Sequence, residues 1–207
     1  AQPLPNSYWA TPYLVACEYP WSPPCAAYTY PKIDLRCPSL AKLLSLVRIG
    51  VRTFIDLTAP SDNLCPYSPL LPALSSALTA ATGEEIQLDY YRVPIEDRSL
   101  PSQAAVSKLL ALLSSLEARS RAQSKSKSSS PIRKPSLTAI HCRGGIGRTG
   151  TIVGCYLLQS GRAKSGPEAL RVINAEWAFV RKRDRYPESP ETGAQWEYVR
   201  SYCAGKP

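Results

Sequence analysis

Hydrophobic and polar positions follow two different periods along the chain. Four short stretches rich in β-branched, aromatic and other apolar residues predict strands at 13–17, 53–58, 86–94 and 136–141. Longer stretches, with apolar positions three and four residues apart, predict helices at 38–47, 71–81, 102–119, 149–160, 167–180 and 191–203. This alternation predicts a single α/β domain with a central, mostly parallel sheet flanked by helices on both faces.

Two local signals and two composition shifts refine this outline. Ser39 is the predicted N-cap of the first helix and Gly50 its end. Residues 1–12 are rich in proline and aromatics and predict an irregular arm, so the folded domain spans 13–207. Within that domain, the Ser/Lys/Arg-rich stretch at about 120–135 predicts an inserted loop.

The composition is that of an ordinary globular protein. Of 207 residues, 44% are hydrophobic and 20% charged, which excludes a chain that is disordered throughout, a collagen and a coiled coil. The longest uncharged stretch, 64–83, is interrupted by prolines, so no transmembrane segment is expected. The first seventeen residues lack the basic start of a signal peptide.

The net charge of +9 is concentrated in two stretches. Residues 119–134 contain six basic residues and no acid, and 181–185 contain four basic residues and one acid, so the rest of the chain sums to zero. A protein basic all over would indicate nucleic acid as its ligand; this distribution makes nucleic acid an unfavoured partner. The two stretches are typical of solvated loops, and the alternative is contact with an acidic partner.

The chain has seven cysteines and one histidine, which bears on whether it forms disulfides or binds a metal. The odd count and the absence of a Cys-x-x-Cys pair argue against a disulfide framework, and a single histidine argues against a structural zinc site. We therefore expect reduced thiols, a cytoplasmic location and no bound metal.

The segment from His141 to Thr149 carries the chemistry. It joins a predicted strand to a predicted helix through a turn with three glycines, an arrangement that aims successive N–H groups and the positive helix end at one anion. The predicted phosphate-binding residues are Arg143, Gly144, Gly145, Ile146, Gly147 and Arg148. A thiol with an ordinary pKa of ~8.5 becomes mostly thiolate when a helix N-terminus and an arginine lower its pKa to roughly 3.5–7.5, so Cys142 is the candidate nucleophile.

The same residues resemble the signature loop of the cysteine-based protein tyrosine and dual-specificity phosphatases, Cys-x5-Arg preceded by His and followed by Ser or Thr. The resemblance implies a protein tyrosine phosphatase-like fold and a covalent cysteinyl-phosphate on Cys142. It implies that Arg148 holds the phosphoryl oxygens and that Thr149 donates a hydrogen bond that makes Cys142 a better leaving group in the second step. It also implies that His141 orders the loop and that neither a metal nor another cofactor takes part.

Two further segments resemble parts of that family. Residues 93–101 resemble the general-acid loop of the dual-specificity branch, Pro-Ile-x-Asp, which selects Asp97 as the acid. Residues 189–196 resemble the segment whose glutamine positions the attacking water, which selects Gln195. Asp97 and Gln195 therefore complete the predicted catalytic set with Cys142, Arg148 and Thr149.

These residues predict a phosphomonoester hydrolase acting on phosphoprotein or phosphopeptide, specific for phosphotyrosine or of dual specificity. One alternative, motivated by Arg143 and the basic stretches, is a phosphoinositide or RNA 5′-phosphatase. The other is a non-catalytic phosphate-binding module. A reversible disulfide between Cys142 and a nearby thiol is a further hypothesis, because exposed low-pKa thiols oxidise readily.

Overall fold

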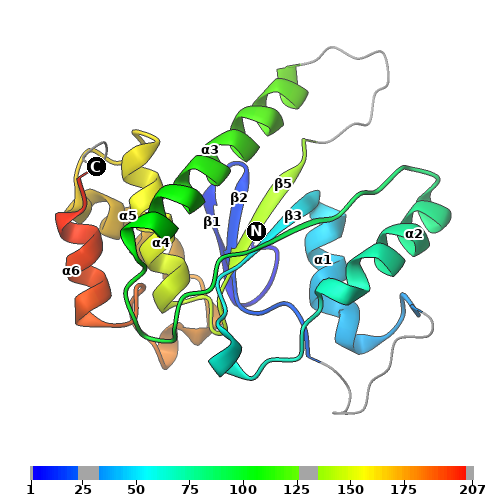
Figure 1. The fold of residues 1–207 in the computed structure, drawn as a ribbon, viewed down its shortest axis with the longest axis horizontal. Coiled ribbons are helices and arrows are strands. Elements are labelled where there is room, and N and C mark those ends of the chain that lie inside the picture. Colours follow the sequence, from blue (N-terminus) through cyan, green and yellow to red (C-terminus); the bar gives the residue numbers. More distant parts are fainter. Residues whose placement is uncertain (1, 23–32, 126–134, 204–207) are drawn as a thin grey trace.

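One five-stranded sheet organises the molecule (Figure 1). The computed structural model describes residues 2–22, 33–125 and 135–203. The strand order is β1-β2-β5-β3-β4, with bounds β1 Ser7–Thr11, β2 Leu14–Cys17, β3 Val51–Asp56, β4 Asp89–Arg92 and β5 Leu137–His141. The β1–β2 pair is antiparallel and the other three pairs are parallel. The predicted mostly parallel sheet is confirmed.

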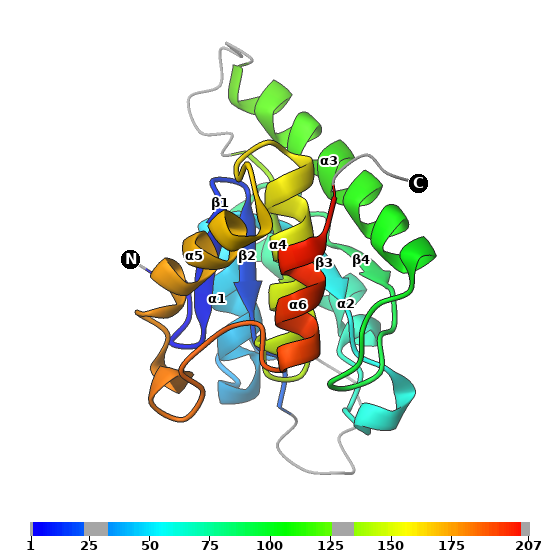
Figure 2. The ribbon, with the colours of Figure 1, turned by 90° about the vertical axis from the view of Figure 1, so that its left-hand side faces the viewer.

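Helices cover both faces of this sheet, also as predicted (Figures 1 and 2). One face carries α1 Ala41–Ile49 and α2 Leu71–Thr82. The other carries α3 Gln103–Lys125, α4 Gly147–Gln159, α5 Gly166–Trp177 and α6 Gly193–Ser201. Short 3₁₀ helices lie at η1 Pro38–Leu40, η2 Pro60–Asp62, η3 Ser68–Leu70 and η4 Arg181–Asp184.

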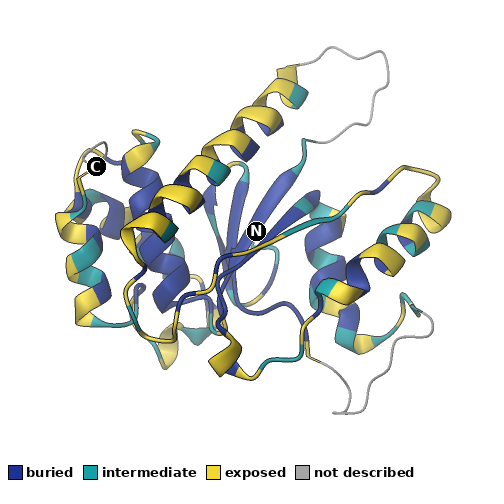
Figure 3. Ribbon diagram, in the orientation of Figure 1, coloured by how far each residue is buried: buried dark blue, intermediate teal, exposed yellow. Residues whose placement is uncertain are grey.

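The sheet separates two hydrophobic cores, and Figure 3 shows its strands as almost entirely buried except for the edge strand β4, which is half-buried to exposed. Along β2, Val15 and Cys17 pack with the α1 and α2 side, whereas Leu14 and Ala16 pack with the α3 to α6 side. Because both faces of the inner strands are covered, most of their residues are buried, and β2 is apolar throughout. The carboxyl ends of β2, β3, β4 and β5 lie at one edge of the sheet, where ligands bind in open α/β sheets.

The N-terminal segment differs from its prediction. The expected irregular arm over 1–12 is wrong at Ser7–Thr11, which form strand β1 at the edge of the sheet. Ser39 is not an N-cap: Pro38 begins η1, and α1 follows from Leu40 without a side-chain cap. Gly50 does end α1, in the left-handed conformation at φ +112° that glycine adopts without strain.

Helix α3 is longer than its periodicity predicts. It continues through the first six residues of the stretch predicted as a loop and ends at Lys125. Ser120 is buried there, and its hydroxyl donates to the carbonyls of Leu116, at 3.0 Å, and of Ser136. Residues 126–134, the remainder of the predicted insertion, lie outside the described residues. Within the described ranges, no helix is both long and apolar enough to cross a membrane.

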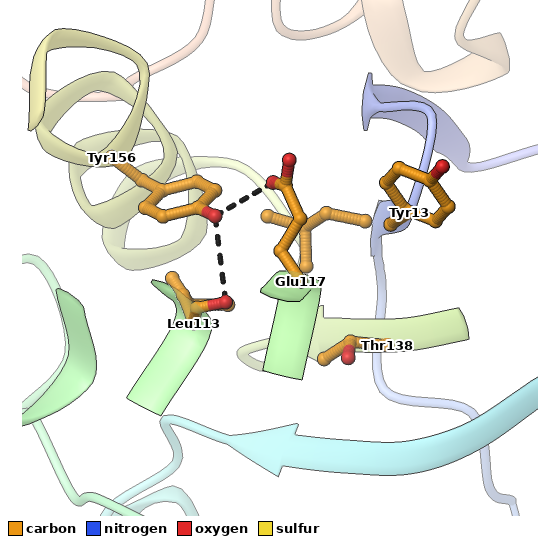
Figure 4. A pocket seen from close by; sticks show the side chains of 6 residues that line it. Tyr13, Leu113, Glu117, Thr138 and Tyr156 are labelled. Carbon is orange, nitrogen blue, oxygen red and sulfur yellow. Dashed lines mark hydrogen bonds between the residues drawn. The ribbon is translucent and has the colours of Figure 1, made fainter. Parts of the chain in front are cut away.

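An ionic network centred on the buried Glu117 joins α3 to α4, beside a small pocket that Thr138 of β5 also lines (Figure 4). Glu117 of α3 accepts a hydrogen bond from the Tyr156 hydroxyl at 2.7 Å, and Tyr156 also reaches the carbonyl of Leu113 at 3.4 Å. The same carboxylate pairs with Arg121 at 2.6 Å and with Arg162. Burial alone would raise the pKa of Glu117, but the bonds from Tyr156 and Arg162 outweigh it, so this pKa is lowered. Glu117 therefore stabilises the fold as a carboxylate.

We expect Glu117→Gln to lower the free energy of unfolding at pH 7 by about 1–3 kcal/mol, because a charged acceptor with several donors is lost. A carboxyl with a lowered pKa contributes above its ordinary value of 4.5 and loses that contribution as the pH falls further. Urea unfolding at pH 7 and pH 3.5 checks this. The difference in free energy of unfolding between wild type and Glu117→Gln should be smaller at the lower pH. The exposed Glu85→Gln serves as the control, and an equal loss in both variants would contradict the assignment.

Candidate active site

The predicted anion-binding loop lies at the carboxyl edge of the sheet, between β5 and α4. Cys142 follows the last residue of β5 and is 3% exposed. The backbone N–H of Gly145 donates to Cys142 Sγ at 3.3 Å. Gly145 adopts φ +75°, and a Cβ there would lie 2.5 Å from the backbone of Cys17, so the turn has room for glycine alone. The turn thus brings the Gly145 N–H to the Cys142 sulfur.

Arg148 is the second residue of α4 and is held by two loops. Its Nη1 and Nη2 donate to the two carboxylate oxygens of Asp62 at 2.6 and 2.9 Å, and Nη1 also donates to the carbonyl of Ile95 at 2.9 Å. Nη2 donates to Asp97 at 2.8 Å. Burial alone would lower the pKa of this guanidinium, but Asp62 and the neighbouring Cys142 and Asp97 outweigh burial and raise it. Arg148 is therefore a permanent cation at the base of the loop.

Asp62 is a site residue that the sequence analysis missed. It is 6% exposed, sits in η2 just after β3 and also accepts the backbone N–H of Ala59 at 2.8 Å. Burial by itself would raise the pKa of this carboxyl, yet the hydrogen bonds from Arg148 and Ala59 lower it. One signal was available: an acidic residue shortly after a predicted strand lies at the edge where the other site residues gather.

Asp97, the predicted general acid, pairs with Arg148. The loop after β4 runs beside the loop after β3, since the N–H of Val93 donates to Asp56 and that of Ile95 to Leu57. This places Asp97 next to Arg148, with its side chain 54% exposed. The neighbouring Glu96 instead accepts from the Ser61 hydroxyl. The loop thus brings Asp97, and not Glu96, to the anion-binding arginine.

His141 is buried and has a structural role in the site. Its Nε2 lies 2.6 Å from the Tyr67 hydroxyl, its Nδ1 3.4 Å from the carbonyl of Cys142 and 3.8 Å from Asp56. Burial lowers the pKa of the imidazole, and the nearby Asp56 only partly opposes this. The ring is therefore neutral at pH 7 and positions the start of the loop.

Thr149 and Gln195, the two remaining predicted catalytic residues, both lie near the phosphate-binding loop. The hydroxyl of Thr149 is buried without a hydrogen-bond partner among the described residues, so the predicted bond to Cys142 is not present here. Gln195 is fully buried in the first turn of α6, where its Oε1 accepts from Thr192 and its Nε2 donates to the carbonyl of Ser99, both at 3.2 Å. A Cβ on Gly147 would lie 2.6 Å from Gln195 Oε1. Gln195 therefore joins α6, the Asp97 loop and the phosphate-binding loop.

Arg143 is exposed, and its carbonyl accepts the backbone N–H of Tyr19 at 3.1 Å.

Among the described residues, no three His, Cys, Asp or Glu side chains gather so as to hold a metal ion. A cavity of about 200 Å³ opens nearby, lined by residues that include Tyr19, Tyr90 and Arg92. None of Cys142, Arg148 and Asp97 lines it, so these three predicted catalytic residues lie outside that cavity.

Cys17 is the thiol of β2 that pairs in register with His141. It packs in the core on the α1 and α2 face, whereas Cys142 packs in the other core. Burial raises the pKa of Cys17, so little thiolate forms there at neutral pH. Cys17 and Cys142 are both free thiols. Cys17 is thus poorly suited to form a bridge with Cys142, and the disulfide hypothesis stays a prediction.

The fold and this loop place the chain in the superfamily of cysteine-based protein tyrosine and dual-specificity phosphatases, as predicted. Within it, the chain belongs to the family described as PTP-SAK, Swiss Army Knife protein, DSP-PTPase phosphatase domain, which matches residues 35–199. No curated protein sequence matches the chain.

Solved structures share the fold at low sequence identity. The active form of Tk-PTP is 21% identical, with 94% of each chain covered and a TM-score of 0.50. PTPMT1 in complex with PI(5)P is 14% identical, with 97% of this chain and 91% of that chain covered and a TM-score of 0.54. The core catalytic domain of the PP-IP phosphatase SIW14 from S. cerevisiae, in complex with citrate, is 17% identical, with 98% and 88% covered and a TM-score of 0.50. These similarities show the shared architecture.

Proposed function

We propose that this chain hydrolyses phosphomonoesters of phosphoproteins, at tyrosine or with dual specificity, through a cysteinyl-phosphate on Cys142. The observation that carries the proposal is the convergence of Cys142, Arg148 and Asp97 at one edge of the sheet. A loop amide donates to the sulfur, and the amino end of α4 adds its positive field. This combination favours a thiolate and an anionic phosphoryl group at the same place.

In the first step, the Cys142 thiolate attacks phosphorus and the bond to the leaving oxygen breaks. Arg148, fixed by Asp62, holds the phosphoryl oxygens as charge develops on them. Asp97 gives its proton to the departing oxygen, which leaves as an alcohol or phenol. A phosphate on Arg148 competes with Asp97 for the guanidinium N–H groups, so substrate binding frees the carboxyl to face the leaving oxygen.

In the second step, water attacks phosphorus and its proton passes to the Asp97 carboxylate. The bond to sulfur breaks, and phosphate and the thiolate are regenerated. Thr149 lies beside the loop with a buried hydroxyl that can turn toward the departing sulfur. Gln195, held between Thr192 and Ser99, places an amide next to Gly147, where it can orient the water.

Asp97→Asn is expected to lower kcat by the ~10²–10⁴ that a lost general acid costs. The fall should be largest for phosphoserine peptides, whose alkoxide leaving group needs the proton, and smallest for para-nitrophenyl phosphate. The alkaline limb of the pH–rate profile should flatten. Steady-state kinetics on both substrates checks this, with Glu96→Gln as the matched control one residue away. An equal fall for both substrates, or a comparable fall in the control, would remove Asp97 from the role of acid.

A second candidate substrate is a phosphoinositide, favoured by the exposed Arg143 directly after the nucleophile. The structurally similar PTPMT1 is described in complex with PI(5)P. Hydrolysis of a phosphotyrosine peptide, a phosphoserine peptide and a phosphoinositide in vesicles, compared at equal enzyme, separates the candidates. Preference for the vesicles, lost in Arg143→Ala, would replace phosphoprotein by lipid. A short 5′-phosphorylated RNA tests the remaining alternative.

A further inference from the structure

The basic stretch at 181–185 does not behave as the uniformly solvated turn that its charge suggests. It forms η4, in which Arg181 and Arg183 are exposed. Lys182 between them is different, since its side chain is 29% exposed and turns toward the active-site loop. The backbone of the turn is tied to the N-terminal segment: the N–H of Arg181 donates to Pro5 at 2.9 Å and that of Lys182 to the Asn6 side chain at 3.1 Å. The position of Lys182 is therefore fixed.

The ammonium group of Lys182 bridges a carboxylate and the phosphate-binding loop. Its Nζ lies 2.6 Å from Glu18 Oε2 and donates to the carbonyl of Gly144 at 3.2 Å. Glu18 also pairs with Lys42 at 2.5 Å and accepts from the side-chain amide of Asn6 at 3.0 Å. Burial alone would raise the pKa of Glu18, but Lys182 and Lys42 outweigh it and lower this pKa. The carboxylate is thus ionised at neutral pH and holds Lys182 against the loop.

The peptide unit between Gly144 and Gly145 links Lys182 to the nucleophile. Its carbonyl accepts from Lys182 at 3.2 Å, and its N–H donates to Cys142 Sγ at 3.3 Å. The C=O and N–H of a trans peptide point in opposite directions, so a group that holds the carbonyl also determines where the N–H points. Glycine on both sides of this unit makes its rotation easy, because glycine has access to most backbone conformations.

We infer that Lys182 is a positioning residue of the active site: held by Glu18, it orients the Gly144–Gly145 peptide so that the Gly145 N–H faces the Cys142 sulfur. The inference rests on the proposed function of Cys142 as nucleophile. Lys182 acts through the loop and does not touch the reacting atoms. One residue of a stretch that is otherwise exposed thereby belongs to the catalytic machinery.

The test compares Lys182→Met with the rescue variant Lys182→Arg and the control Arg183→Met, an exposed neighbour in the same turn. Two measurements are made: kcat and KM for para-nitrophenyl phosphate, and the pH midpoint for alkylation of Cys142 by iodoacetamide, followed on its own peptide by mass spectrometry. Lys182→Met should lower kcat/KM by roughly tenfold and move the midpoint up by roughly one pH unit, which is about what one hydrogen bond to a charged group supplies. Lys182→Arg should recover most of both, and Arg183→Met should change neither.

In a second variant, Glu18→Gln, the lysine at 182 is kept but the carboxylate that pairs with it is removed. This variant should move the alkylation midpoint in the same direction by a smaller amount, so the inference stays testable if Lys182→Met does not fold. An unchanged midpoint in folded Lys182→Met overturns the inference. So does a loss confined to KM with an unchanged midpoint, which would make Lys182 a substrate contact. Alkylation needs no turnover: absence of hydrolysis in wild type would defeat the proposed function, while the midpoint shift would still decide the role of Lys182.

Discussion

Cys142→Ser should abolish hydrolysis of para-nitrophenyl phosphate measured in excess chelator, with a fall of at least ~10⁴-fold, as expected when the covalent nucleophile of an enzyme is removed. A serine hydroxyl is protonated at neutral pH, and neither Arg148 nor the loop amides can make it an alkoxide. The anion-binding groups are untouched by this change. The variant should therefore bind phosphate and vanadate with nearly wild-type affinity, which isothermal titration calorimetry can measure.

The two measurements together separate the functions considered for this site. Activity in wild type and none in the variant, with binding retained in both, supports a cysteine-dependent phosphatase. Wild-type-like turnover by Cys142→Ser would exclude a covalent intermediate on this residue. No turnover in either protein, with phosphate bound by both, would favour the non-catalytic phosphate-binding module.

Asp62→Asn should be costly for both activity and stability. The substitution keeps the shape of the side chain but removes the charge that faces the buried guanidinium of Arg148 at 2.6 and 2.9 Å. Breaking a buried ion pair by removing one partner costs about 3–5 kcal/mol, and the amide oxygen of asparagine recovers part of it, so we expect a loss of about 2–3 kcal/mol. With Arg148 less well oriented, kcat/KM should fall by roughly 10–100-fold.

Urea unfolding and steady-state kinetics check this prediction, with the exposed Asp184→Asn as control. The pKa of Asp62 is lowered, so its contribution to stability is present above the ordinary value of 3.8 and disappears as the pH falls through the lowered value. The gap between wild type and Asp62→Asn should consequently close at strongly acidic pH. A variant with unchanged kcat/KM would show that Arg148 is oriented without Asp62.

Arg148 and Lys182 contact different partners around the loop: Arg148 pairs with Asp62, and Lys182 pairs with Glu18 and bonds to the carbonyl of Gly144. In the proposed roles, Arg148 holds the phosphoryl group and Lys182 orients the loop amide toward the sulfur. A combined Asp62→Asn and Lys182→Met variant should therefore show nearly additive losses if the two act on separate parts of the site.

The local sequence pattern was sufficient to predict most helices and strands, because each of these depends on residues close together in the sequence. Helix α2 follows its apolar spacing, and Gly50 ends α1 because glycine accepts the left-handed backbone. The elements that were missed depend on neighbours distant in the sequence. Strand β1 is stabilised by pairing with β2 in the sheet, and α3 continues to Lys125 where Ser120 meets Ser136 from the start of β5.

The residues of the site also fall into two groups, those predicted from the sequence and those that only the structure reveals. Cys142, Arg148 and the glycines between them lie within seven consecutive residues, so their spacing alone predicted an anion-binding loop with a nucleophile, and Asp97 was predicted through its resemblance to a known loop. Asp62 and Lys182 lie 86 residues before Arg148 and 38 residues after Gly144, in segments with no motif of their own. Only the tertiary structure could assign them, because an ion pair and a lysine–carbonyl bond depend on distances in space, which the order of residues does not contain.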